Sequence, residues 1–127
     1  MTPTEKISSE VVCLVDDDPA VLKAISRLLA SDGFSIQAFN EPNDFLAYVE
    51  DHAVPLVILD LWMEQLNGLE VQARLRALSP QTRMIIVTGR EDHATGIATL
   101  DCGAIGYFIK PFDDEQFLAT GLRLWRM

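Results

Sequence analysis

The sequence predicts an α/β fold, a five-stranded parallel sheet that is doubly wound with helices on both faces. Five short apolar runs alternate with five longer stretches that carry apolar residues at helical spacing. This alternation is typical of β-α-β units, which bury a parallel sheet between two layers of helices. The 127 residues are 49% hydrophobic, enough for one packed core. We therefore expect a single domain over residues 1–127, with residues 1–8 as a flexible tail.

The predicted strands are short apolar runs, and most of them end abruptly at a polar residue. They span Val11–Val15, Ser35–Phe39, Leu56–Leu59, Met84–Val87 and Gly106–Ile109. The third run is the most hydrophobic and the second is the weakest. Strands that are buried on both faces are expected to be hydrophobic throughout, as most of these are.

The predicted helices lie between the strands and follow the last one. They run from Pro19 to just before Asp32, over Pro42–Val49, Leu69–Leu78 and His93–Asp101, and onward from about Asp113. Asp18 and Pro19 form a favourable N-cap and first-turn pair. Gly96 lies inside the fourth helix and costs it about 1 kcal/mol relative to Ala, so we expect this helix to be the least stable.

Composition argues against several classes of protein. A net charge of −9 disfavours direct binding to nucleic acid, whose phosphates attract Lys and Arg. No apolar run reaches the ~18 residues of a membrane helix, and the first ten residues lack the apolar segment of a secretory signal. Cys13 and Cys102 form no CxxC pair, so a thiolate metal site is disfavoured and a reduced, cytoplasmic setting fits best.

Polar residues follow four of the five predicted strands. Asp16 and Asp17 come after the first, Asp60 after the third, Thr88 after the fourth and Lys110 after the fifth. In an open α/β sheet, ligands bind beyond the carboxyl ends of the strands. Three consecutive aspartates before a proline would alone suggest only a polar turn. Together with the other strand ends they predict a site, with Asp18 left as a helix cap.

This set of side chains suits a divalent cation and a phosphoryl group. Three adjacent carboxylates repel one another, and Mg²⁺ relieves the repulsion because it prefers oxygen ligands. The formal charges of the three aspartates, Lys110 and the cation sum to zero, so the site as a whole is neutral. Within it Asp60 can act as a nucleophile that forms an aspartyl phosphate. Lys110 and the metal can stabilise charge on the transferred group, and Thr88 can donate a hydrogen bond to it.

Four motifs, VVCLVDDDP, LVILDLWMEQLNGLE, IIVTG and GAIGYFIKPF, together resemble the receiver domain of bacterial two-component response regulators. The resemblance extends from about Ile7 to Trp125. It implies a flavodoxin-like sheet of order 2-1-3-4-5. It also implies that Asp60 is phosphorylated by a histidine kinase or a phosphotransfer protein in a phosphorelay.

The resemblance assigns roles to individual residues. It implies that Mg²⁺ binds Asp17, Asp60 and the backbone carbonyl of Trp62, and that Asp16 binds the ion directly or through water. Thr88 and Lys110 would contact the phosphoryl oxygens. A cis peptide between Lys110 and Pro111 would aim the lysine, at a type of bond where the cis form costs little.

The resemblance also implies a switch. After phosphorylation Thr88 would move toward the phosphate, and Tyr107 would follow into the vacated space. This movement would reshape the face formed by the fourth helix, the fifth strand and the fifth helix. A homodimer through that face and a DNA-binding output domain in a longer parent chain, as in a transcription regulator, are further expectations.

Two positions depart from the pattern of the family. Glu64 stands where a proline is usual, and Trp62 is bulky for its place. We hypothesise that Trp62 stacks with Arg90 by a cation–π contact of about 0.5–1 kcal/mol and shields the phosphate from water. We interpret His52 and His93 as surface residues and not as ligands.

Other functions fit less well. A phosphohydrolase with an aspartyl nucleophile typically needs a second Asp two residues later, where Trp62 stands. A flavin or nucleotide site would need a glycine-rich loop in place of the first aspartates. A receiver that serves only as a phosphate sink or a protein-contact module remains the alternative. We do not expect an enzyme, beyond slow self-dephosphorylation.

Overall fold

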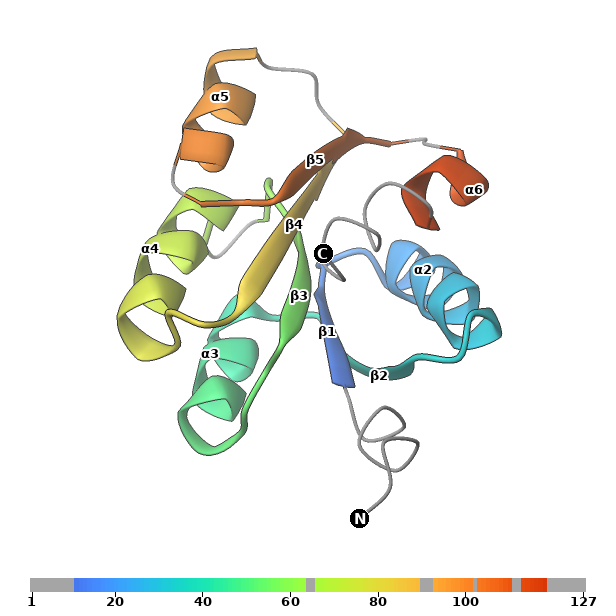
Figure 1. Cartoon of the computed structure of the whole chain (residues 1–127), viewed down its shortest axis with the longest axis horizontal. Helices are drawn as coiled ribbons and strands as arrows, with labels where there is room; N and C mark the ends of the chain where they lie inside the picture. Colours follow the sequence, from blue (N-terminus) through green and yellow to red (C-terminus); the bar gives the residue numbers. More distant parts are fainter. Residues whose placement is uncertain (1–10, 64–65, 90–92, 102, 111–112, 119–127) are drawn as a thin grey trace.

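The structure is a computed structural model that describes residues 11–63, 66–89, 93–101, 103–110 and 113–118. Its centre is a five-stranded sheet of order β2-β1-β3-β4-β5 in which every pair of neighbours is parallel. Helices cover both faces of this sheet (Figure 1). The predicted fold class and strand order are confirmed.

The strands agree with the apolar runs to within one residue at each end. They are β1 (Val11–Val15), β2 (Ser35–Phe39), β3 (Leu56–Asp60), β4 (Arg83–Thr88) and β5 (Gly106–Ile109). Asp60 and Thr88 are therefore the last residues of their strands, where the sequence placed them one residue beyond. This difference matters because the hydrogen-bonded backbone of a strand fixes the positions from which both side chains project.

The described helices are α2 (Pro19–Ser31), α3 (Pro42–Asp51), α4 (Gly68–Leu78), α5 (His93–Asp101) and α6 (Asp114–Gln116). Of these, α2, α4 and α6 begin after capping side chains, those of Asp18, Asn67 and Asp113. The Asp18 side chain accepts a hydrogen bond from the Ala20 backbone N–H, and the Asn67 side chain accepts one from Glu70. Residues 1–8, the predicted tail, and the later part of the last predicted helix lie outside the described residues. None of the described helices has the length and apolar character needed to cross a membrane.

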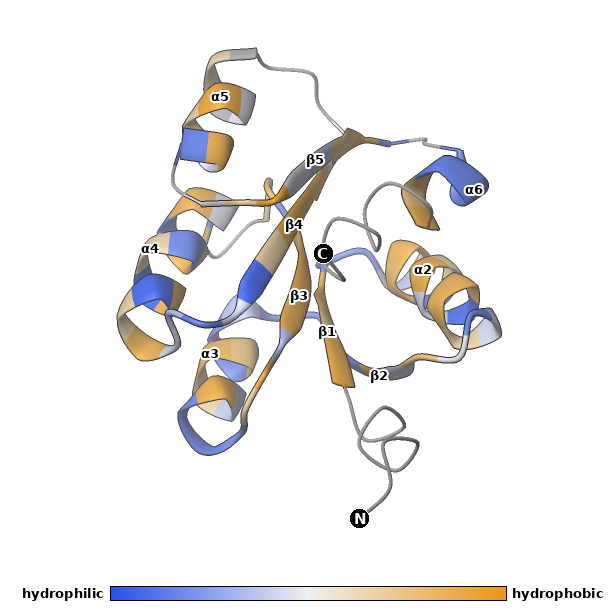
Figure 2. Cartoon of the chain, in the orientation of Figure 1, coloured by the Kyte–Doolittle hydropathy of each residue, from blue (hydrophilic) through white to orange (hydrophobic). Residues whose placement is uncertain are grey.

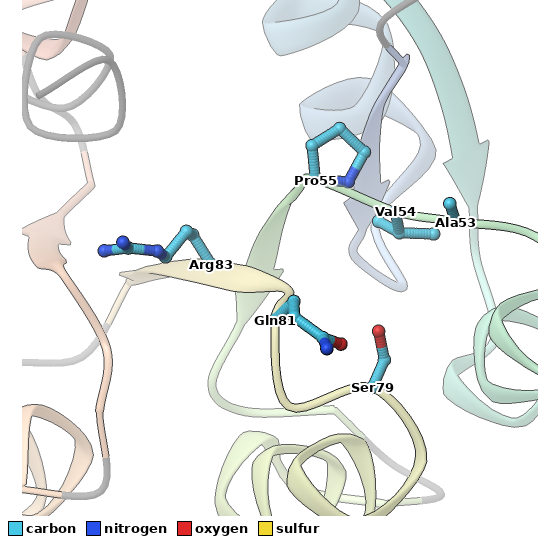
Figure 3. A pocket seen from close by; sticks show the side chains of 6 residues that line it. All are labelled: Ala53, Val54, Pro55, Ser79, Gln81 and Arg83. Atoms are coloured by element: carbon cyan, nitrogen blue, oxygen red, sulfur yellow. The ribbon is translucent and has the colours of Figure 1, made fainter.

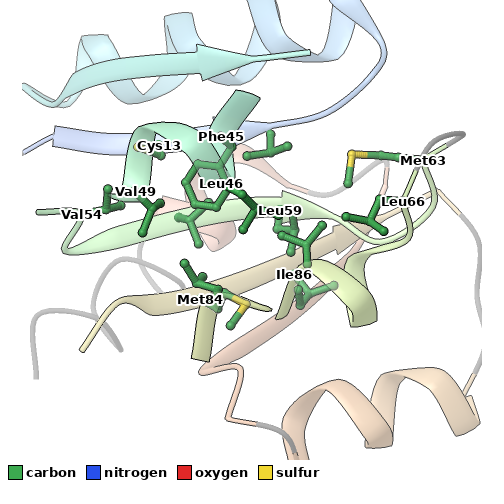
Figure 4. Close-up of a cluster of buried hydrophobic side chains, with 14 of the residues drawn as sticks. Cys13, Phe45, Leu46, Val49, Val54, Leu59, Met63, Leu66, Met84 and Ile86 are labelled. Carbon is green, nitrogen blue, oxygen red and sulfur yellow. The ribbon is translucent and has the colours of Figure 1, made fainter. Parts of the chain in front are cut away.

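The sheet separates two hydrophobic clusters. The ribbon of its central strands is coloured hydrophobic over most of its length (Figure 2). One cluster lies under α3 and α4 and includes Cys13, Phe45, Leu59 and Ile86 (Figure 4). The other lies under α2 and the start of α6, and its members are Val12, Leu14, Ile25, Leu29, Leu56, Ile58, Ile85, Val87 and Phe117. Alternate residues of β1, β3 and β4 point to opposite clusters, as the two-residue period of a strand requires. Burial on both faces explains why these strands are apolar along their whole length.

Strand register brings the predicted site residues to one edge. Val15 pairs with Leu59, Asp60 with Val87, and Thr88 with Ile109. Backbone bonds extend the pairing by one step, since Leu61 N–H donates to the Val87 carbonyl. Parallel strands in this register end side by side, so the residues that follow them share the carboxyl edge of the sheet.

Candidate functional site

Three carboxylates meet at the carboxyl edge of the sheet. One oxygen from each of Asp16, Asp17 and Asp60 lies within 4.8 Å of the other two. Asp16 and Asp60 are only 1% and 4% exposed, whereas Asp17 is exposed. Asp16 is also fixed locally, because its Oδ1 accepts a hydrogen bond of 2.9 Å from the Asp18 N–H. The structure thus brings together the three predicted acidic residues, two buried and one facing solvent.

Lys110 enters this cluster from the end of β5. Its Nζ donates a hydrogen bond of 2.9 Å to Asp16 Oδ2 and a longer one of 3.4 Å to Asp60 Oδ1. The Lys110 N–H donates to the carbonyl of Thr88, which continues the β4–β5 ladder by one residue. The ammonium group therefore links the ends of β1 and β3 through β5.

The electrostatics of the site follow from burial and from crowding of like charges. Desolvation, with the nearby charge of Asp16, raises the pKa of Asp60 from 3.8 to about 6 even though Lys110 opposes the shift. Burial alone would lower the pKa of Lys110, but its hydrogen bond to Asp16 and the charge of Asp60 outweigh burial and raise it. Lys110 is therefore protonated at neutral pH, and Asp60 holds its charge at a cost in free energy.

A cavity of about 310 Å³ opens over these groups. It is lined by Asp16, Asp17, Asp18, Asp60, Trp62, Gly89 and Lys110. Trp62 is partly exposed and also packs against the hydrophobic cluster under α3 and α4. Trp62 thus lines the cavity together with Asp60.

Thr88 and Tyr107 lie beside the site and not in its cavity lining. Thr88 is fully buried at the end of β4. Tyr107 lies on β5, paired with Ile86 of β4, and is partly buried. The pair thus occupies adjacent strands, and the expected coupled movement of the two side chains stays a prediction.

The donor set fits a divalent cation that prefers oxygen ligands. Three carboxylate oxygens lie close enough to bind one ion. Burial first, and then the charge of Asp16, raises the pKa of Asp60 in spite of Lys110, so a cation bound there would stabilise the charged carboxylate. Mg²⁺ usually takes one or two carboxylates, keeps water in its other positions and binds a phosphate oxygen. The acidic cluster is compatible with Mg²⁺ and contains no sulfur or imidazole ligand from the described residues.

A second and larger pocket lies at the amino ends of β3 and β4, opposite the carboxyl edge of the sheet (Figure 3). Its volume is about 590 Å³, and Ala53, Val54, Pro55, Ser79, Gln81 and Arg83 line it. Arg83 points away from Ser79 and Gln81 in this view. The described residues that line the pocket include no carboxylate, and they lie at the other end of the strands from Asp60, so its size does not make it the functional site.

Sequence reasoning overlooked part of the cavity lining. Gly89 lines it directly after Thr88, and Asp18 lines it in addition to capping α2. Their places at strand ends were a usable signal. Glu64, Arg90 and Pro111 lie outside the described residues, so the loop path, the Trp62–Arg90 stack and the cis peptide stay predictions.

The two histidines were expected at the surface. His52 is exposed, stacks on the Tyr48 ring at 3.9 Å and has its Nδ1 2.9 Å from the Tyr48 carbonyl. This contact caps the end of α3 and leaves His52 remote from the acidic cluster. The side chain of His93 is outside the described residues.

Comparison with known proteins gives the family. The family model described as "Response regulator receiver domain" matches residues 12–120. The chain is 38% identical over 117 residues to response regulator protein TmoT of Ectopseudomonas mendocina, covering 90% of this chain and 53% of TmoT. It is 36% identical over 112 residues to response regulator protein TodT of Pseudomonas putida, covering 88% of this chain and 49% of TodT.

A solved structure agrees in fold. The receiver domain protein (CheY-like) of Methanospirillum hungatei JF-1 superposes with a TM-score of 0.85 at 24% identity, covering 92% of this chain and 94% of that one. The chain spans about half the length of TmoT and TodT. The match of motifs, sheet order and acidic site has one explanation: this chain belongs to the response-regulator receiver-domain family.

Proposed function

We propose that this domain is a phosphorylation-controlled switch in which Asp60 accepts a phosphoryl group from a histidine kinase or a phosphotransfer protein. The observation that carries the proposal is the acidic cluster, with three carboxylate oxygens within 4.8 Å and Lys110 bonded to Asp16 and Asp60. A structural ion pair would need only one carboxylate for one lysine. The surplus of negative charge at an open cavity points to a bound cation and an anionic substrate.

In the transfer, an Asp60 carboxylate oxygen attacks phosphorus and forms a P–O bond. The bond between phosphorus and the donor nitrogen of phosphohistidine breaks, and its electron pair stays on that nitrogen. Lys110 lies where it can neutralise charge on the phosphoryl oxygens, and its raised pKa keeps it protonated. Thr88 and Lys110 then hold the product, an acyl phosphate.

Asp16, Asp17, Asp60 and the backbone carbonyl of Trp62 would hold Mg²⁺. When bound, the cation would supply positive charge to the phosphoryl oxygens. Burial of Asp60 lets the fixed charges around it act in a medium less polarisable than water. The rest of the site contributes by orientation, since Asp16 is held by the Asp18 N–H and Lys110.

Phosphorylation would be read out through Thr88, Tyr107 and the face formed by α5, β5 and the last helix. TmoT and TodT are named as response regulator proteins and are about twice as long as the match. We therefore propose that this domain acts with an output domain, by homodimerisation through that face, in a cytoplasmic phosphorelay. The only catalysis we propose for it is slow self-dephosphorylation.

The decisive experiment is incubation with acetyl phosphate and Mg²⁺ followed by intact mass measurement. One phosphoryl group adds about 80 Da. Wild type and the matched control Asp51→Asn, an exposed carboxylate on α3, should gain this mass, and Asp60→Asn should not. A gain in Asp60→Asn, or none in wild type, would overturn the proposal.

A further inference from the structure

Among the described residues of helix α5, only the small residues Gly96 and Thr99 are buried. The helix lies beside α4 and next to the edge strand β5 (Figure 1). Its larger aliphatic side chains face solvent, with Ile97 60% exposed, whereas Gly96 and Thr99 are buried. The buried contacts of the described part of α5 are therefore those of Gly96 and Thr99.

The first contact is between Gly96 and the ring of Tyr107. A Cβ atom built on Gly96 would lie 3.0 Å from Tyr107 Cε1 and 3.1 Å from Cζ. Real Cβ atoms are rarely that close to another heavy atom. The backbone of α5 thus lies directly against the aromatic ring, and a Cβ atom at position 96 would require the ring or the helix to shift by a few tenths of an ångström.

The second contact is a buried hydrogen bond from α4. Gln72 Nε2 donates to the Thr99 carbonyl at 2.9 Å, and Gln72 is 1% exposed. The Thr99 hydroxyl in turn donates to the Gly96 carbonyl at 2.8 Å. A chain of two hydrogen bonds therefore runs from α4 to the residue that lies on Tyr107.

We propose that Gly96 is a positioning residue for Tyr107, and that Gln72 anchors α5 so that the ring, and not the helix, responds to the size of residue 96. This inference rests on the proposed function in that it concerns the side chain expected to follow Thr88. It adds that two residues outside the phosphoryl site, Gly96 and Gln72, set the relative populations of the positions of the Tyr107 ring.

The chemistry of Gln72 favours an anchoring role over simple packing. Its Oε1 accepts no hydrogen bond from the part of the chain that the structure describes, although the atom is buried. Burying half of an amide unsatisfied is unfavourable, and an apolar residue of similar shape would avoid it. The Thr99 carbonyl also accepts from the Ala104 N–H at 3.1 Å, so it keeps a partner without Gln72.

These facts make two informative variants. Gly96→Ala adds one methyl group toward the ring and raises helix propensity, so α5 should still form. Gln72→Met removes the donor at nearly constant volume and leaves the Thr99 carbonyl satisfied. In Gly96→Ala alone the anchored helix cannot retreat, so Tyr107 must move; with Gln72→Met added, the helix can yield instead.

The test uses fluorine NMR of protein labelled with 3-fluorotyrosine. The chain has two tyrosines, Tyr48 and Tyr107, so Tyr48→Phe assigns the two resonances. Gly96→Ala should lower the population of the present ring position, changing the ratio of the two positions by about twofold to thirtyfold. Tyr48 serves as the internal reference, and Ile97→Ala, at an exposed position of the same helix, serves as the control variant.

The Gln72→Met/Gly96→Ala protein should recover at least half of the displacement of the Tyr107 resonance. A Tyr107 resonance in Gly96→Ala that superimposes on wild type would refute the role of Gly96. Equal displacement in the single and double variants would refute the anchoring role of Gln72. A displacement of the same size in Ile97→Ala would also overturn the proposal, because helix propensity would then explain the effect.

Failure of the proposed function can be told apart from failure of this inference. The ring comparison is made without any phosphodonor, so it decides the inference by itself. Acetyl phosphate and Mg²⁺ are then added to the same labelled samples, and intact mass reports on Asp60. Unchanged mass would sink the proposed function and leave the fluorine result standing.

Discussion

The Nζ of Lys110 lies 2.9 Å from Oδ2 of Asp16, although 94 residues separate them in the chain. The same nitrogen is 3.4 Å from Oδ1 of Asp60. Asp16 holds the lysine more closely than the proposed phosphoacceptor does. Lys110 is thus held at the site before any phosphoryl group arrives, and an oxygen of Asp60 stays within reach of a donor in the cavity.

Replacing Lys110 by Met should destabilise the domain. The Asp16 carboxylate would lose one of the two hydrogen bonds that it accepts from described residues, while remaining buried beside two other carboxylates. Leaving a buried charged acceptor short of a donor costs about 1–3 kcal/mol in the free energy of unfolding. Urea denaturation in EDTA measures it, with Lys23→Met, an exposed lysine on α2, as the control. Equal stability of the two variants would contradict the strength assigned to this contact.

Replacing Asp60 by Asn should stabilise the domain without metal. The folded pKa of about 6 exceeds the ordinary value of 3.8, so between these pH values the folded state binds more protons than the unfolded state. Wild type therefore loses stability as pH rises through that window, and Asp60→Asn does not. The difference in free energy of unfolding between Asp60→Asn and wild type, called the gap below, should open above pH ~4. It should reach about 1–3 kcal/mol above pH ~6, at about 1.4 kcal/mol per pKa unit.

Thermal unfolding from pH 4 to 8 in EDTA measures this gap. Mg²⁺ should narrow it, because a cation bound to wild type offsets the repulsion that Asn removes. Asp51→Asn provides the matched control, since Asp51 is exposed. Lower stability of Asp60→Asn at pH 7.5 in EDTA would show that the site is not electrostatically strained.

Replacing Gly68 by Ala should destabilise the loop that follows Asp60. A Cβ atom on Gly68 would lie 2.8 Å from Leu61 Cα and 3.2 Å from the Asp60 carbonyl oxygen, both backbone atoms that cannot rotate away. Overpacking of this kind costs about 1–3 kcal/mol. Gly89→Ala is the control, because its Cβ would meet no atom of the described residues within 4 Å. Equal urea midpoints for both variants would contradict the prediction.

Replacing Trp62 by Ala should shorten the lifetime of the acyl phosphate. Trp62 lines the cavity together with Asp60, so its removal should admit water. If the expected stacking of about 0.5–1 kcal/mol is lost from the barrier, hydrolysis should accelerate about twofold to fivefold. Loss of the phosphoryl adduct of about 80 Da over time measures the rate of hydrolysis. Trp62→Phe should retain most of the protection. A half-life that is unchanged or longer in Trp62→Ala would exclude shielding.

Cys13 should be inert in the folded protein. It is fully buried in β1, and desolvation raises the pKa of its thiol to about 12. Since the thiolate is the reactive species, a disulfide reagent at pH 8 should label Cys13 only after unfolding. A Cys102→Ser variant isolates Cys13 for this assay. Stoichiometric labelling without denaturant would show that β1 opens readily.

Much of the fold was predictable because its signals are local. Apolar runs such as Leu56–Leu59 and capping residues such as Asp18 act within a few residues of themselves, and β-α-β alternation restricts the topology. The predicted site followed from this topology: if parallel strands end at one edge, Asp16, Asp60 and Lys110 lie at that same edge. Helical and strand periodicity thus carried both the fold class and the residues of the acidic cluster.

Tertiary packing alone decided how those residues differ from one another. The residues themselves do not show how the burial of Asp16 and Asp17 differs. In the structure Asp16 is buried and hydrogen-bonded to Lys110, whereas Asp17 is exposed. Gln72 looks like any helix residue until α5 places the Thr99 carbonyl within 2.9 Å of it. Such contacts depend on the angles at which helices and strands pack, and those angles are properties of the whole core and not of any short segment.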